Sequence, residues 1–201
     1  MKSFIRILSV YSILLSATIV SAQDSNTSLE SWKWGAGFGV LRNGYQGGFD
    51  ITSPGFSKWG PQDANLMSIF LDLGFIELPD SVLNANNKLQ DSTHLQSAIG
   101  LRATNIVADR VQGYSKLGVN FINWDSKIKN ADGSAASWGM LLTFGADFFM
   151  GPSRYIPFGA KTESAFVELG WRMSHKRSDA ISGEPALFNG FGINFGYRMH
   201  Y

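Results

Sequence analysis

The sequence has no cysteine and few charged residues. Without cysteine there is no disulfide framework, no thiolate metal site and no cysteine nucleophile. Charged residues make up 16% of the 201 residues, below the roughly 25% usual for soluble domains. Beyond residue 22 no apolar run reaches about 18 residues, so that part of the chain is predicted to contain no membrane-spanning helix.

Three kinds of functional site also lack their sequence signals. The histidines have no ligand-like spacing, so no metal is expected. Gly35, Gly37 and Gly39 alternate within a predicted strand and do not form a phosphate-binding loop between a strand and a helix. No run of basic residues marks a nucleic-acid surface. We therefore expect no metal, no cofactor and no nucleic-acid partner.

The first 22 residues have the pattern of an export signal. Lys2 and Arg6 precede an apolar stretch, and small residues lead up to Ala22. The stretch is shorter than the ~20 apolar residues that a spanning helix needs. We expect residues 1–22 to be a cleaved signal peptide and residues 23–201 to be one domain; an uncleaved anchor is the alternative.

Glycine and aromatic residues are abundant, and they alternate with a period of two. From Phe191 onward, large apolar residues occupy the odd positions, while glycine, amide and charged residues occupy the even positions. Strict alternation predicts strands with one apolar face. Eight segments share this pattern: 32–41, 45–52, 67–76, 95–104, 111–123, 138–148, 165–174 and 191–201.

The eight segments predict an all-β, up-and-down antiparallel transmembrane β-barrel of about eight strands. Their lengths are near the 9–11 residues that a tilted spanning strand needs. The second face is mostly glycine with single charges, which suits the narrow interior of a small barrel. We therefore predict that the apolar face points outward, to lipid. In the alternative, a soluble periplasmic β-barrel that binds an apolar ligand, the apolar face would form the core.

The polar face carries the candidate site. Charges inside a narrow barrel must be paired or hydrated, because an isolated buried ion is costly. We predict an internal ion-pair network, with Asp147 facing Arg172 from the preceding strand, and Asp50 and His200 on the same polar face. The predicted network residues are Lys33, Asp72, Arg102, Lys116, Asp147, Glu168, Arg172 and Arg198. A plugged structural lumen is favoured over a gated, porin-like passage, since eight strands enclose no open channel.

Connections and strand ends give weaker signals. The segments 77–93, 124–136 and 175–188 are expected to be extracellular loops, and tryptophans and tyrosines near strand ends suggest an interfacial girdle. The segments 53–64 and 151–162 should be periplasmic turns, which are usually short, but both are long. A shifted strand boundary or an ordered plug would explain their length.

The last strand resembles the terminal signal of bacterial outer-membrane barrels. That pattern has a polar residue, a glycine, a hydrophobic residue and a final aromatic residue, and here Asn194, Gly196, Met199 and Tyr201 match it. The chain resembles the OmpA/OmpX-like small barrels. The resemblance implies location in the bacterial outer membrane, contact with its lipid and lipopolysaccharide, recognition by the barrel-assembly machinery, and a monomer.

The same class of small barrels suggests an enzymatic alternative. Some are lipid A deacylases, with histidine and serine two residues apart on the lipid-facing side. Here His175 and Ser178 are three apart, and the next strand offers no outward acid, although Glu184 lies in the loop between. A serine nucleophile needs a base in reach and an orienting group behind it. The sequence therefore favours a non-enzymatic barrel with a structural, surface-interaction or narrow-passage role.

Overall fold

In the computed structural model, every regular element among the described residues is a β-strand. The structure describes residues 31–41, 44–59, 65–78, 92–108, 110–123, 136–152, 160–174 and 190–201. The strands in these ranges are β1 (Lys33–Leu41), β2 (Gly44–Thr52), β3 (Ser57–Trp59), β4 (Asn65–Leu78), β5 (Ser92–Ala108), β6 (Val111–Asn123), β7 (Ala136–Pro152), β8 (Thr162–Ser174) and β9 (Gly190–His200). The all-β prediction is confirmed, and each of the eight predicted segments overlaps one strand.

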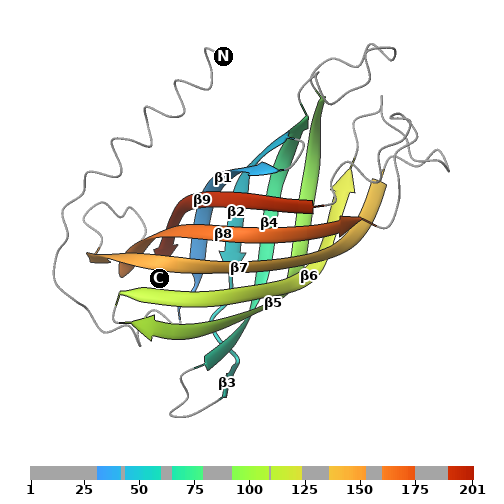
Figure 1. The fold of residues 1–201 in the computed structure, drawn as a ribbon. Helices are drawn as coiled ribbons and strands as arrows, with labels where there is room; N and C mark the ends of the chain where they lie inside the picture. Colours follow the sequence, from blue (N-terminus) through green and yellow to red (C-terminus); the bar gives the residue numbers. More distant parts are fainter. Residues whose placement is uncertain are drawn as a thin grey trace, which may run out of the picture.

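Eight of the described strands form a closed antiparallel barrel. Successive strands pair with each other, β2 pairs with β4, and β9 pairs back onto β1 to close the ring. In Figure 1, β7, β8 and β9 cross in front of β2 and β4, as opposite walls of a barrel with tilted strands. The up-and-down order is confirmed.

The two ends of the barrel are named here by what lies there. The terminal end is where β1 begins and β9 finishes. At the loop end the chain passes through 79–91, 124–135 and 175–189, which lie outside the described residues.

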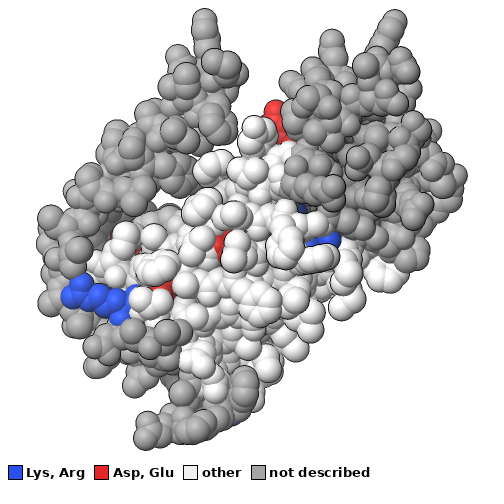
Figure 2. All heavy atoms as spheres, in the orientation of Figure 1, with Lys and Arg blue, Asp and Glu red and all other residues white. Residues whose placement is uncertain are grey.

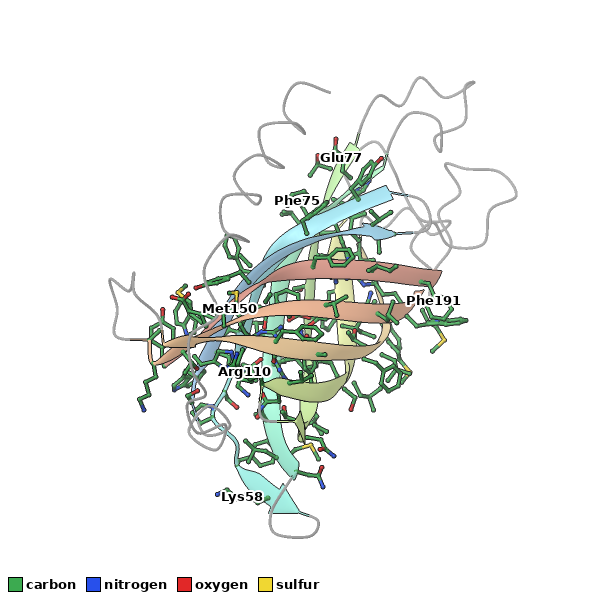
Figure 3. All side chains as sticks on the ribbon, turned by 60° about the vertical axis from the view of Figure 1, so that its left-hand side comes forward. Lys58, Phe75, Glu77, Arg110, Met150 and Phe191 are labelled. Atoms are coloured by element: carbon green, nitrogen blue, oxygen red, sulfur yellow. The ribbon has the colours of Figure 1, made fainter. Side chains whose placement is uncertain are left out.

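The two long connections at the terminal end are explained by strand boundaries. Residues 57–59 form β3, which pairs with β4, and the backbone N–H of Phe56 donates to the carbonyl of Met67 at 2.9 Å. β3 therefore continues the path of β2 along β4 after a local interruption. In Figure 3, Lys58 on β3 lies beside one end of β4, and Glu77 lies at the other end of β4. Likewise β7 runs to Pro152 and β8 begins at Thr162. Both predicted turns, 53–64 and 151–162, therefore include residues that belong to strands.

The barrel has a polar interior and an apolar exterior. Among the described residues, twenty buried side chains are polar or charged and eight are hydrophobic, whereas 26 large hydrophobic side chains are exposed. Figure 2 shows one face on which most of the described surface is uncharged, with a few acidic and basic groups. This is the reverse of a water-soluble protein. The prediction that the apolar face points outward is confirmed.

Inward glycines make room for the large interior side chains. Gly145 lies opposite Tyr114 across β6 and β7, and a Cβ added to it would be 2.5 Å from the Tyr114 ring. A Cβ on Gly37 would be 2.7 Å from the ring of Phe166. Both separations are far below van der Waals contact, so glycine at these positions lets the rings fill the lumen.

A candidate functional site in the lumen

Arg198 on β9 lies at the centre of the interior charges. Its Nε donates to Asp50 Oδ2 at 3.0 Å, one terminal nitrogen bonds to Asp147, and the other lies 3.2 Å from Glu168 Oε1. Asp147 also accepts from Arg102 Nη2 at 2.5 Å. Both guanidinium groups and Asp147 have an exposed fraction of 0%. One carboxylate is therefore shared by two buried cations.

The network continues from Glu168 toward the loop end. Lys116 Nζ lies 3.0 Å from Glu168 Oε1 and 3.2 Å from Asp72 Oδ1. The Tyr114 hydroxyl donates to Glu168 Oε1 at 2.8 Å and accepts from Arg198 at 3.3 Å. We define the lumen network as these connected side chains: Asp50, Asp72, Arg102, Tyr114, Lys116, Asp147, Glu168 and Arg198. They come from seven of the eight barrel strands.

Aromatic rings separate and support these charges. The Arg102 guanidinium lies 3.7 Å from the Tyr114 ring centroid, and that of Arg198 lies 4.3 Å from the Phe166 centroid. Lys116 Nζ is 5.2 Å from the centroid of Phe70. A cation over a ring face is favourable, most of all where water is excluded. The interior is thus a packed, hydrogen-bonded plug.

Ion pairing occurs across the lumen and rarely between neighbouring strands. Asp50 lies directly opposite Asp72 on β2 and β4, and Arg102 lies directly opposite Lys116 on β5 and β6. Like charges in such positions repel each other. They are tolerated because each of these four side chains pairs with an opposite charge on a strand that is not adjacent to its own. Five of the six described ion pairs join such non-adjacent strands.

All eight predicted network residues point inward, but two are not in an ion pair among the described residues. Arg172 donates to Gln96 Oε1 at 2.5 Å, and Lys33 donates to Gln112 Oε1 at 3.4 Å. The predicted pairing of Asp147 with Arg172 is wrong. In the β7–β8 register Asp147 faces Phe166, so its carboxylate lies near Arg198 and Arg102.

The sequence reasoning missed Tyr114 as a network member. Tyr114 is on the same alternation as Lys116, so its parity already placed it inside the barrel. Its aromatic ring made it resemble an outward residue. The hydroxyl group was the available signal, because a buried tyrosine usually hydrogen-bonds through it.

The remaining space inside the barrel is small. Two described cavities lie among the lumen charges: one of about 50 Å³ is bordered by Asp72, Lys116, Glu168 and Arg172, and an adjoining one of about 10 Å³ shares three of these residues. A water needs roughly 10–15 Å³ measured in this way. These two cavities have room for a few waters, whereas the described cavity of about 600 Å³ is lined mainly by outward side chains such as Phe75, Leu95 and Trp138.

The residues of the C-terminal pattern occupy distinct positions. Asn194 points inward and is bonded to Gln46, and Gly196 packs against the Phe166 ring. Tyr201 follows β9; its ring makes an edge contact with Trp34, with centroids 6.3 Å apart, and its hydroxyl lies 3.7 Å from Met199 Sδ. The final aromatic residue thus joins a cluster on the outside of the terminal end.

Comparisons with known proteins leave the geometry as the basis for function. No family model matches the chain, and no curated protein matches it significantly. In the part of the chain that the structure describes, no group of three or more His, Asp or Glu side chains is placed to hold a metal. The same residues include no helix long and apolar enough to cross a membrane. His175, Ser178 and Glu184 lie outside the described residues.

Proposed function

We propose that this chain is an exported, membrane-spanning β-barrel of the bacterial outer membrane, with a structural or surface-interaction role and a sealed lumen. The observation that carries the proposal is the reversed distribution of polarity. Large apolar side chains are exposed on every barrel strand, while most of the described buried side chains are polar or charged. A closed barrel leaves no unpaired strand edge, so its backbone polar groups are satisfied within hydrocarbon.

The ends of the barrel carry aromatic groups suited to a membrane interface. Trp34 and Tyr201 contact each other at the terminal end, and Trp171 contacts Phe191 at the loop end with centroids 4.6 Å apart. Figure 3 shows Phe191 at the loop end of β9. Amphipathic rings favour the headgroup region. Lipid and lipopolysaccharide are then the first partners, and the barrel-assembly machinery would read the last strand.

The first test is electrophoretic mobility of membrane-extracted protein before and after heating. We expect the protein in the outer-membrane fraction, with faster migration when unheated, because a closed barrel stays folded in detergent. Processing after Ala22 would shorten the chain to 179 residues, which mass spectrometry of the same sample measures. Soluble protein with unchanged mobility would contradict the proposal.

The sealed lumen makes a second prediction. The barrel inserted in a planar bilayer should show no steady conductance in 1 M salt, because buried side chains block the lumen and cavities of about 50 and 10 Å³ are the space they leave. A sixteen-stranded porin is the positive control, since such barrels enclose an aqueous channel. Regular single-channel steps from purified protein would instead support a narrow solute passage.

A further inference from the structure

A buried lysine, Lys33, lies at the terminal end of the lumen. Lys33 has an exposed fraction of 0%, and its Nζ has Gln112 Oε1 as its hydrogen-bond acceptor at 3.4 Å. Among the described residues no carboxylate forms an ion pair with it. Asp147 is already bonded by Arg102 and Arg198. Burying an ammonium group without a carboxylate is costly, and a bound counter-charge would lower that cost.

Among the described residues, the interior has one basic residue in excess. The inward acidic residues are Asp50, Asp72, Asp147 and Glu168, and the inward Lys and Arg residues are Lys33, Arg102, Lys116, Arg172 and Arg198. Arg102, Lys116 and Arg198 each form an ion pair with a carboxylate. Arg172 borders the cavity of about 50 Å³, which has room for water. Lys33 has neither, so the excess positive charge is localised at the terminal end.

Two further hydrogen-bonding groups in the same part of the lumen have no partner. Gln112 Nε2 and His200 Nδ1 are buried and lack an acceptor among the described residues. His200 lies directly opposite Lys33 in the β1–β9 register, and its Nε2 is 2.8 Å from Ser164 Oγ. When the serine hydroxyl donates to Nε2, the ring proton is on Nδ1, which becomes a donor.

We propose that the terminal end of the lumen binds one small inorganic anion of the halide class, held by Lys33 Nζ, Gln112 Nε2 and His200 Nδ1. Two buried N–H donors that lack an acceptor among the described residues, beside a lysine whose described acceptor is a neutral amide oxygen, call for an acceptor that is also negative. None of the three described cavities is bordered by these residues, so the space between them suits a monatomic ion better than an organic acid. This site does not depend on a membrane around the barrel.

The test is equilibrium unfolding in urea at constant ionic strength, with sodium chloride replacing sodium gluconate. Binding to the folded state alone stabilises it, and above Kd each tenfold increase in chloride should raise the folding equilibrium constant about tenfold. Lys33→Met, which keeps the length of the side chain and removes its charge, should abolish this dependence. Arg172→Met, the matched control, should keep it.

Three results would overturn the proposal. The first is that the stability of the wild-type protein does not depend on chloride. The second is that the dependence survives in Lys33→Met and so reflects surface binding. The third is that Arg172→Met loses the chloride dependence. Because Lys33→Met can fail to fold, wild-type crystals grown in sodium bromide give an independent readout. An anomalous peak within hydrogen-bond distance of Lys33 Nζ is expected, and water density with no anomalous signal there would contradict the anion.

Discussion

Asp147→Asn is expected to destabilise the barrel by about 3–5 kcal/mol, the largest loss among the interior carboxylates. The substitution keeps the shape of the side chain but leaves Arg102 and Arg198 without their shared counter-charge, and both are fully buried. Removing one partner of a buried ion pair has a cost of this size. Urea unfolding followed by tryptophan fluorescence measures it.

Asp72→Asn is the matched control for that prediction. Asp72 has a side-chain exposure of 24%, and its partner Lys116 keeps Glu168 at 3.0 Å when Asp72 is neutralised. A loss of about 1 kcal/mol or less is therefore expected, because Asp72 is partly solvated and Lys116 keeps a carboxylate partner. Equal losses of folding free energy for the two variants would contradict the expectation that Asp147 stabilises the barrel more because two buried cations share it.

Leu117→Arg is expected to cost about 2–4 kcal/mol when the barrel is folded in lipid vesicles. Leu117 is exposed in the middle of β6, opposite Leu101 and Leu142 on the neighbouring strands. A charge there would lie near the centre of the hydrocarbon layer, where arginine on the lipid face of a barrel has this cost. A urea titration in vesicles, compared with the wild-type protein, gives the free-energy difference.

The depth dependence separates lipid from water as the surrounding medium. Leu95 is exposed at the loop end, opposite Asn123, the last residue of β6. Leu95→Arg should cost only about 0–1 kcal/mol, because charge is tolerated near the interface. If the outer surface met water, both substitutions would lie within about 0.5 kcal/mol of the wild-type protein, and the membrane assignment would fail.

The strands and their orientation could be predicted from the sequence because both follow from one period. Alternation places Lys116 and Arg198 on one side and Leu117 and Met199 on the other, whatever the partner strand. β3 was missed because three residues are too few to show a period. The proline and glycine before it also read as a turn.

Pairing inside the lumen could not be predicted in the same way. It depends on strand register and on which walls face each other across the barrel, and neither is contained in a local pattern. Asp147 and Arg172 are on adjacent strands with the correct parity, yet Asp147 is bonded to residues of β5 and β9. The aromatic plug shows the same limit, since the position of Phe166 beside Gly37 and Gly196 appears only once the barrel is closed.

The connection between Arg198 and Asp50 has a consequence for how the chain folds. The two residues are 148 positions apart and lie on either side of β1, so they meet only when the first and last strands have joined. Until then Asp50 lacks the cation with which it pairs in the lumen, and hydration is the way to stabilise its carboxylate. The other described ion pairs join strands between β4 and β9, so they can form before the ring closes. Joining of β1 to β9 and loss of water from around Asp50 are therefore one step, and the last gain from the polar face comes with ring closure.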